Sequence, residues 1–228
     1  MLKKTVILMI LVMVAGALAL PVWAADDAAE AKKIVAESRT TLNDFLSDPD
    51  MNWIKSHFPQ AKGILIVPTL GKGAFIIGGS GGVGVLLTRN AKGHWSNPAF
   101  YKMGSVSIGL QAGGSASEVL LFIQSQKGVD SFLTSSFKLG ADASVAAGPV
   151  GQGAKASTSD ILAFSRSKGA YAGASFDGSV INPSEDLNKA FYGKDVSPVD
   201  ILVRGSVKSE EAAPLVSALT KAAPPKGK

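Results

Sequence analysis

Residues Phe137 to Gly153 read FKLGADASVAAGPVGQG, and this run indicates the class of fold. Apolar and polar side chains alternate along its first half, with Leu139 and Val145 on one side and Asp142 on the other. A period of two is typical of a strand with one buried face. Nearly all the side chains are small, which suits a strand that another backbone or a ligand approaches closely. The run therefore predicts a β-rich, tightly packed protein with a strand over 137–147.

Glycine-rich sequence surrounds this run, since all but three of the 25 glycines lie between Gly63 and Gly193. Short apolar or alternating segments bounded by turn signals follow one another there. The predicted strands span residues 64–67, 74–77, 83–89, 105–113, 118–125, 137–147, 161–167 and 170–180. Short strands without long intervening helices argue against a parallel α/β sheet. We expect an α+β fold: a curved antiparallel β-sheet, or two packed sheets with a barrel-like core, of about eight strands, flanked by N-terminal and C-terminal helices.

Helices are predicted at both ends of the chain. Apolar residues recur at helical spacing before Ser47, at Ala28, Ala31, Val35, Leu42 and Phe45. Asp48 and Pro49 are typical of the cap and first residue of a second short helix, which Pro59 ends. Further helices are predicted over 127–134, 184–191 and 209–221, the last interrupted at Pro214. Packing onto the domain is the simpler interpretation of the apolar stripes, and a membrane-facing amphipathic element is the alternative.

The first 24 residues have the features of a signal peptide. Two lysines precede an apolar stretch, and small residues precede a cut that we expect after Ala24. An uncleaved membrane anchor is the alternative, because the stretch approaches transmembrane length. The chain has no cysteine, which argues against a lipid-anchored lipoprotein and a disulfide scaffold. We expect a periplasmic or secreted bacterial protein with one domain over 25–221, including a helical segment over 25–60, and a disordered tail over 222–228.

The formal net charge of +5 is unevenly distributed along the chain. Residues 25–60 are net acidic, whereas residues 61–193 are net basic. A modest basic surplus is compatible with an anionic partner. No nucleic-acid-binding motif accompanies it, so nucleic acid is not an expected partner.

Two glycine motifs match catalytic or nucleotide-binding patterns literally. Gly79–Gly84 matches G-x-G-x-x-G, and Gly78–Gly82 matches G-x-S-x-G. The dinucleotide fingerprint needs a helix after it, whereas Val85–Thr88 predicts a strand. A nucleophile elbow needs a later acid and then a histidine, but His94 follows with no acid in between. We interpret both matches as a glycine bend between strands.

Other catalytic chemistry finds little support. Two histidines and no cysteine argue against the common zinc sites, and we expect neither a metal nor a cofactor. Asp142 is the carboxylate that could act as a general acid or base. Its simpler interpretation is a structural carboxylate that accepts hydrogen bonds from backbone N–H groups of the glycine-rich turn after it. We therefore expect a protein that is not an enzyme.

Residues His94 to Tyr101 form a dense polar and aromatic cluster. Packing into the core is the favoured interpretation, because aromatic side chains usually pack. A headgroup or interface site is the alternative, because Trp and Tyr favour the membrane boundary.

Taken together and in order, several segments of the chain resemble the SYLF domain family. They are Gly63–Pro68, Gly78–Leu87, Trp95–Tyr101, Ser105–Ser115, Phe137–Gly151, Ser165–Gly169 with Gly173 and Phe176, Asn188, and Phe191–Gly193. The resemblance covers most of the chain after the leader, and the family includes yeast and animal endocytic proteins and exported bacterial members. It implies a lipid-binding module that is not an enzyme. Eukaryotic members bind phosphoinositides and other anionic lipids, and some bind actin, which is not expected for an exported protein.

We therefore predict a non-enzymatic protein of the cell envelope that binds anionic phospholipid at a membrane surface, through basic contacts and apolar insertion. The candidate phosphate contacts are Lys62, Lys72, Lys102, Arg166 and Lys168. The candidate apolar contacts, if the helices lift away, are Val35, Leu42, Phe45, Trp53 and Phe58. One alternative is a soluble periplasmic carrier with an internal small-molecule or acyl-chain pocket, and another is a hydrolase that uses Asp142.

Overall fold

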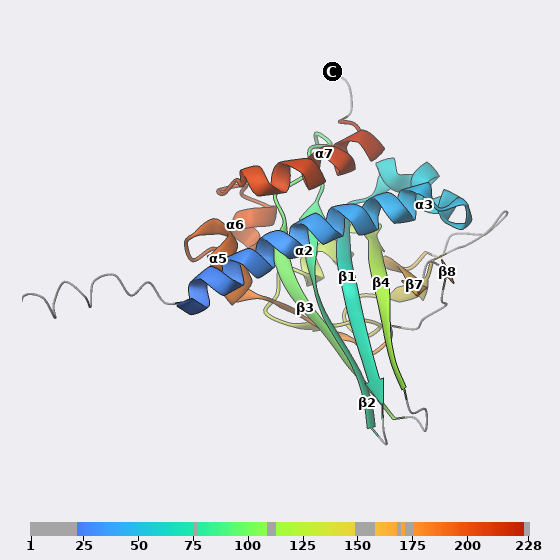
Figure 1. Ribbon diagram of the computed structural model, residues 1–228. Helices are drawn as coiled ribbons and strands as arrows, with labels where there is room; N and C mark the ends of the chain where they lie inside the picture. The colour runs from blue at the N-terminus through green and yellow to red at the C-terminus, as the bar shows by residue number, and fades with distance from the viewer. Residues whose placement is uncertain are drawn as a thin grey trace, which may run out of the picture.

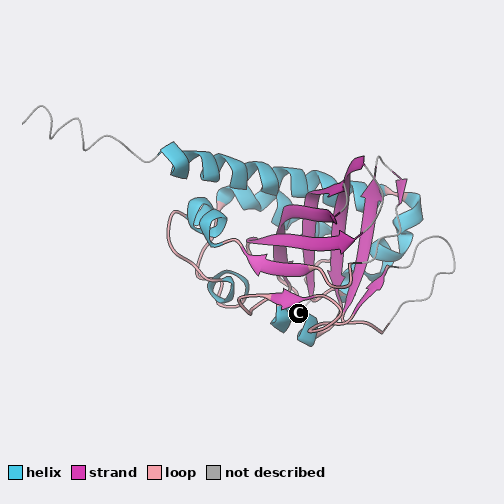
Figure 2. Ribbon diagram, turned by 90° about the horizontal axis from the view of Figure 1, so that it is seen from below, coloured by secondary structure: helices cyan, strands magenta, loops and turns pink. Residues whose placement is uncertain are grey.

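The computed structural model describes residues 22–74, 77–108, 113–148, 158–167, 170–171 and 176–225. In these ranges the chain forms one curled sheet with helices packed against it (Figures 1 and 2). Nine described strands join in the order β5-β9-β3-β2-β1-β4-β7-β6, with β8 paired to β7. The named strand pairs are antiparallel apart from β6 with β7. The prediction of an α+β fold with a curved antiparallel sheet and flanking helices is confirmed.

The elements follow one another from the N-terminus to the C-terminus. The strands are β1 (Gly63–Ala74), β2 (Ile77–Thr88), β3 (Ala99–Ile108), β4 (Gly113–Ile123), β5 (Phe137–Lys138), β6 (Val145–Ala147), β7 (Ile161–Ser167), β8 (Ala170–Tyr171) and β9 (Val180–Pro183). The helices are α2 (Val22–Ser47), α3 (Asn52–His57), α4 (Gln126–Ser131), α5 (Glu185–Tyr192), α6 (Pro198–Leu202) and α7 (Ala213–Ala222). Short 3₁₀ turns are η1 (Pro49–Met51), η2 (Phe58–Gln60) and η3 (Glu210–Ala212).

The central strands have an apolar side chain on both faces, and this divides the core in two. Ile64 and Ile66 of β1 pack under α2, α3, α5 and α7. Leu65 and Val67 point to the opposite face, where α4 and α6 pack. All four side chains are fully buried. Each contributes about 2 kcal/mol by leaving water, so the central strands supply much of the stability.

The glycine-rich segment Gly78–Gly82 lies inside β2, and its interpretation as a bend between strands is wrong. The register of β1 with β2 shifts between Ile66 and Thr69, where β1 has an irregularity of the β-bulge type. A Cβ atom on Gly84 would overlap the carbonyl oxygen of Ile66. Gly82 and Gly84 of β2 therefore allow the backbones of β1 and β2 to approach closely at this irregularity. Because β2 continues as a strand, neither literal glycine motif has the helix that its chemistry needs.

The predicted strand over 137–147 is also wrong, because the chain turns within it. Strand β5 ends at Lys138, Gly140 has a φ of +86°, and a new strand begins only at Val145. The left-handed backbone at Gly140 reverses the chain, which alternation of small residues does not reveal. Asp142 lies in this turn, and its carboxylate accepts a hydrogen bond from the backbone N–H of Lys138 at 2.7 Å. Asp142 is therefore a structural carboxylate, as the favoured interpretation predicts. Its donor, however, lies before it in the chain and not in the turn after it. Residues 149–153 lie outside the described ranges.

The remaining strand predictions differ in accuracy. The strand over 161–167 is confirmed with the same bounds, as β7. Of the separate strand predicted over 74–77, Ala74 belongs to β1 and Ile77 to β2, and the two residues between them lie outside the described ranges. The strand over 170–180 is wrong in its described part, because residues 176–179 form a turn before β9 begins at Val180, whereas residues 172–175 lie outside the described ranges.

The predicted helix boundaries agree closely with the structure. Helix α2 ends at Ser47, and the Asp48 side chain accepts a hydrogen bond from the N–H of Asp50 at 2.9 Å. The second short helix begins at Pro49 but is divided into η1, α3 and η2. Helices α4, α5 and α7 were predicted, whereas α6 was not. The described chain continues past α7, where Ala223 is buried and Arg89 donates to its carbonyl oxygen and to that of Pro224.

The aromatic cluster over 94–101 packs into the core, as the favoured interpretation predicts. Trp95, Phe100 and Tyr101 are buried. The Tyr101 hydroxyl donates to the carbonyl oxygen of Phe132 at 2.6 Å, and burial raises the pKa of Tyr101 well above its ordinary value. Asn188 of α5 is fully buried and accepts a hydrogen bond from the backbone N–H of Phe100 at 2.9 Å. This contact ties α5 to the start of β3.

Asp160 joins three segments just before β7. Its carboxylate accepts hydrogen bonds from the Ser125 hydroxyl and from both the hydroxyl and the N–H of Ser144. Ser125 in turn caps α4 by accepting from the N–H of Gly128. The Ser125 and Ser144 hydroxyls lower the pKa of Asp160 to about 2. The ionised carboxylate thus stabilises the start of α4 and the parallel pairing of β6 with β7.

We expect Asp160 to make stability depend on pH in acid. A carboxyl whose pKa is lower in the folded state stabilises it above the unfolded pKa near 4, and this contribution is lost as the pH falls toward 2. The natural protein should therefore lose more stability between pH 4 and pH 2 than Asp160→Asn, which cannot ionise there. Urea unfolding followed by circular dichroism at several pH values measures the difference. Parallel pH curves for the two proteins would contradict the assignment.

Candidate functional site

Helix α2 lies across one face of the sheet, where the predicted apolar contacts are found (Figure 1). Val35, Leu42 and Phe45 of α2 are at most 2% exposed, as is Phe58 after α3, and Trp53 is 9% exposed. All five belong to the core between the helices and the sheet. With α2 and α3 seated as they are, these side chains contact protein. Their insertion into a membrane stays a prediction that requires the helices to leave the sheet.

The predicted phosphate contacts do not form one cluster. Lys62 precedes β1 and Lys102 lies on β3, and both are exposed. Arg166 lies at the end of β7 and is largely buried. Lys72 lies in the described backbone of β1, but its side chain is outside the description, and Lys168 lies outside it altogether.

Arg166 lies in a cage of carboxylates between the sheet and α2. Its guanidinium donates to Glu118 on the neighbouring strand β4, with Nε and Nη2 at 3.0 and 2.9 Å from Oε2. Nη2 also lies 3.1 Å from Asp44 at the end of α2, and Nη1 lies 3.6 Å from Asp48. The Thr41 hydroxyl of α2 donates to the other oxygen of Glu118 at 3.0 Å. Through these contacts the sheet holds the C-terminal half of α2.

The charges in this cage support one another. Burial lowers the pKa of Arg166. The hydrogen bond and charge of Glu118, together with the charges of Asp44 and Asp48, raise this pKa by more, so the net shift is upward. The guanidinium also lies over the ring of Phe45, with its carbon 5.7 Å from the centroid. While α2 is seated, the donors of Arg166 are directed at protein carboxylates and not at a ligand.

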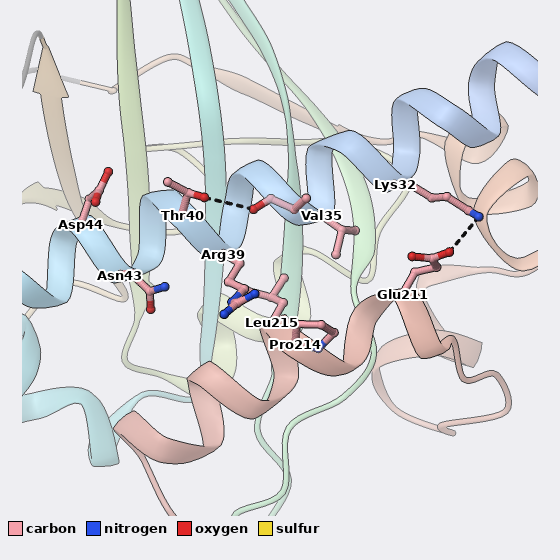
Figure 3. Close-up of a pocket in the computed structure, with 10 residues that line it drawn as sticks. Lys32, Val35, Arg39, Thr40, Asn43, Asp44, Glu211, Pro214 and Leu215 are labelled. Atoms are coloured by element: carbon pink, nitrogen blue, oxygen red, sulfur yellow. Dashed lines mark hydrogen bonds and ion pairs between the residues drawn. The ribbon is translucent and has the colours of Figure 1, made fainter.

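A groove runs along the outer side of α2, where α7 lies beside it. One cavity of about 580 Å³ lies between the two helices and is lined by Lys32, Val35, Arg39, Glu211 and Leu215, among others. Lys32 reaches across the groove to Glu211 at 2.8 Å, and Arg39 extends from α2 toward α7 (Figure 3). Buried Val35 and Leu215 form an apolar floor.

A second cavity of about 650 Å³ continues the groove toward α3. The two cavities share Arg39, Asn43 and Pro214. Lys55 of α3 and Lys221 of α7 join Arg39 in lining the second cavity, and none of the described residues that line it is a carboxylate. Within the described ranges, the side chains of these three cations make no hydrogen bond or ion pair. We call this second cavity, with Arg39, Lys55 and Lys221, the cationic groove.

The sequence predictions did not include these three residues. Arg39 and Asn43 are four residues apart, so they share one polar face of the predicted first helix. That spacing could have marked Arg39 as an exposed cation on the side away from the core. No sequence signal places Lys221, which is 182 positions from Arg39 along the chain, beside it. Only the packing of α7 on α2 brings them together.

The described residues contain neither a metal-binding cluster nor a membrane-spanning helix. Among them, no three His, Asp or Glu side chains are grouped so that they could hold a metal ion. None of the helices in the described part of the chain is long and apolar enough to cross a bilayer. The arrangement suits recognition of an anionic group, because three cations at the mouth of a partly apolar groove attract negative charge.

The fold and groove define an α+β domain with an outer helical layer that presents unpaired positive charge. A family model described as Las17-binding protein actin regulator, Ysc84, matches residues 104–222. The chain belongs to this family, which is the SYLF family that the sequence motifs resemble. The recognition from the sequence motifs is thus confirmed.

Similarity to curated proteins extends beyond that segment. Protein YSC84 of Saccharomyces cerevisiae is 35% identical over 162 residues, which cover 68% of this chain and 34% of the relative. LAS seventeen-binding protein 3 of the same yeast is 34% identical over 151 residues, covering 63% of this chain and 33% of that protein. SH3 domain-containing YSC84-like protein 1 of Homo sapiens is 27% identical over 166 residues, covering 70% and 48%. The chain thus spans about a third to a half of the length of these relatives.

Proposed function

We propose that this protein is a non-enzymatic, peripheral phospholipid-binding protein of the cell envelope. Its outer helical layer would face an anionic membrane surface. The observation that carries the proposal is the set of three cations, Arg39, Lys55 and Lys221, that line the groove without a carboxylate among them. Family membership and the expected signal peptide support it. The names of the relatives refer to Las17 and SH3 domains, and an exported protein would meet neither them nor actin.

Energetics favour a surface mode in which α2 stays seated. A basic side chain near an anionic membrane contributes about 1 kcal/mol, so three of them supply about 3 kcal/mol of salt-sensitive attraction. Lifting α2 would move Val35, Leu42 and Phe45 from one apolar surrounding to another, with little gain in hydrophobic free energy. It would also break the Arg166 cage and expose Ile64 and Ile66 of the sheet. We therefore propose electrostatic adhesion first, with apolar insertion confined to small movements of the helices.

The carrier hypothesis receives less support from the sheet. Its two faces are filled by the clusters that contain Ile64 and Ile66 on one side and Leu65 and Val67 on the other. The cavities along α2 lie between helices, at the surface of the domain. A pocket between strands, which that hypothesis requires, would have to form in this filled core.

Vesicle binding tests the proposal. Protein purified after export, with its N-terminus determined by mass spectrometry, is sedimented with phosphatidylglycerol or phosphatidylcholine vesicles. We expect binding to phosphatidylglycerol at low salt and little binding to phosphatidylcholine. Binding should be lost in about 1 M salt, because electrostatic attraction then reaches only a few ångströms. The mass spectrum also tests the expected cut after Ala24.

A charge-matched pair of variants locates the surface. The triple variant Arg39→Gln, Lys55→Gln and Lys221→Gln should lose most of the binding, whereas Lys138→Gln, Lys194→Gln and Lys208→Gln, which alters three exposed lysines elsewhere, should retain it. Absence of sedimentation with anionic vesicles at low salt would refute the proposed function. Equal losses for both triple variants would refute the assignment to the helical layer.

A further inference from the structure

The cationic groove has the dimensions of a discrete ligand site as well as the charge of an adhesive surface. Its volume of about 650 Å³ lies within the range of small-molecule sites. Its walls come from three segments, with Arg39 and Asn43 on α2, Lys55 on α3, and Ser217 and Lys221 on α7. The three segments are separate in the sequence and converge around a cavity, which distinguishes the groove from a flat charged patch.

The described carboxylates near the groove are paired with cations outside it, so the three cations of the groove have no carboxylate partner among them. The two carboxylates that line the adjoining cavity are already engaged, Glu211 with Lys32 at 2.8 Å and Asp44 with Arg166 at 3.1 Å. Figure 3 shows the ion pair of Lys32 with Glu211 at one end of the adjoining cavity, away from Asn43. Neither member of this pair lines the cavity that contains Lys55 and Lys221. Negative charge in the groove region is therefore neutralised by other cations, which leaves the positive charge of Arg39, Lys55 and Lys221.

The rest of the lining selects the kind of anion. Asn43 and Ser217 offer neutral hydrogen-bonding groups beside the cations. Leu46, Pro214, Ala218 and Ala222 supply an apolar side, which suits the glycerol and first methylene groups of a lipid. Among the described residues of this lining there is no carboxylate that could pair with the ammonium of a zwitterionic headgroup. The groove thus fits a phosphate that carries a neutral substituent.

We propose that the cationic groove binds one phosphate-bearing headgroup of an anionic glycerophospholipid, with one ligand per protein. The proposal rests on the proposed function and adds a stoichiometric site and a headgroup class to it. The Arg39 guanidinium supplies a planar set of donors for phosphate oxygens, and the two lysines supply point charges from the other walls. The neighbouring apolar side chains hold the glycerol end of the lipid.

Binding of a soluble lipid separates this site from general adhesion. Dihexanoyl phosphatidylglycerol, kept below its micelle concentration, is titrated into the exported protein and followed by calorimetry. We expect saturation at one ligand per chain, at least a tenfold weaker affinity for the double variant Arg39→Gln and Lys221→Gln, and no measurable binding of dihexanoyl phosphatidylcholine. The double variant Lys138→Gln and Lys194→Gln, which removes the same charge elsewhere, should bind as the natural protein does.

The remaining arms decide between sources of the phosphate and between roles of the lysines. Saturable binding of inorganic phosphate with equal affinity would overturn the lipid assignment in favour of a free phosphate. Lys55 and Lys221 lie in the last turns of their helices, where a cation also stabilises the helix itself. Thermal unfolding of the variants measures that role, and weaker binding at unchanged unfolding temperature supports the site.

Failure of this proposal and failure of the proposed function give different results. Vesicle binding without saturable binding of the soluble lipid would refute the discrete site and leave surface adhesion standing. Saturable, groove-dependent binding of the soluble lipid without vesicle binding would support the site and refute the membrane-surface role.

Discussion

Replacing Gly84 with alanine is expected to lower the free energy of unfolding by about 3 kcal/mol, the upper part of the range for overpacking a core. The added Cβ atom would overlap the carbonyl oxygen of Ile66 and lie 2.8 Å from Cγ2 of Val67. Ile66 lies in the central strand β1, next to its bulge, and its backbone is held by β2 and β4 on either side. Because the obstructing atom belongs to paired backbone, a small rotation cannot relieve the overlap. Urea unfolding followed by circular dichroism measures the loss.

Gly81→Ala is the matched control for this substitution. Gly81 lies in the same strand, but a Cβ atom there would meet no atom within 4 Å. Its effect should stay within about 0.5 kcal/mol, as for other exposed positions without a special contact. If the two variants lost similar amounts of stability, the cost would come from replacing any glycine of this strand and not from the close approach of β1 to β2.

Replacing Arg166 with glutamine is expected to destabilise the protein by about 3 kcal/mol, at the lower end of the range for breaking a buried ion pair. The substitution would leave Glu118, Asp44 and Asp48 close together without their shared cation. Repulsion among these carboxylates would weaken the seating of α2, because Asp44 lies in its last turn and Asp48 directly follows it. Urea unfolding gives the loss of stability, and faster amide hydrogen exchange along α2 would show that this helix is the part that is destabilised.

Two further variants test whether the cage is responsible. Adding Glu118→Gln to Arg166→Gln removes one of the three uncompensated charges and should restore part of the stability. Arg204→Gln breaks an exposed ion pair with Asp200 of α6, four residues before it in the chain, and should cost no more than about 0.5 kcal/mol. An Arg166→Gln protein as stable as Arg204→Gln would disprove the role of the cage.

The consequence for function concerns α2. The Arg166 cage and the apolar core under α2 act on the same helix, so its release would require both to be given up. If Arg166→Gln increases vesicle binding while destabilising the protein, movement of α2 contributes to association. If binding stays unchanged, the seated helical layer and its groove are sufficient.

The local sequence was enough to predict those elements that local chemistry defines. The end of α2 at Ser47 follows from the Asp48–Pro49 pair, in which Asp48 caps and Pro49 begins the next helical segment. Strand β7 follows from a short apolar run between turn residues, with the same bounds as predicted. Strand predictions failed where glycine was ambiguous, since a glycine can turn the chain, as at Gly140, or stay inside a strand, as at Gly84. The neighbouring backbone decides between these roles, and it is not local in sequence.

The candidate site shows the same division more strongly. Apolar residues chosen as membrane contacts, such as Leu42 and Phe45, have the helical spacing of any buried stripe, and the structure places them in the core. Arg166 looks like any exposed cation in the sequence, yet carboxylates from α2 and β4 surround it. Its partners lie at least 48 positions away in the chain, beyond the range in which side-chain spacing is informative.

By itself, the sequence determined the family, the α+β class and the bounds of the capped helices. These follow from patterns that are either local or carried by ordered motifs. Only the tertiary structure decided which charges are free. Arg166 loses its availability because α2 carries carboxylates to it, and Arg39, Lys55 and Lys221 acquire a common groove because α7 packs beside α2. The sequence gives the position of each charge along the chain but not its distance from other charges, and electrostatic interactions depend on that distance.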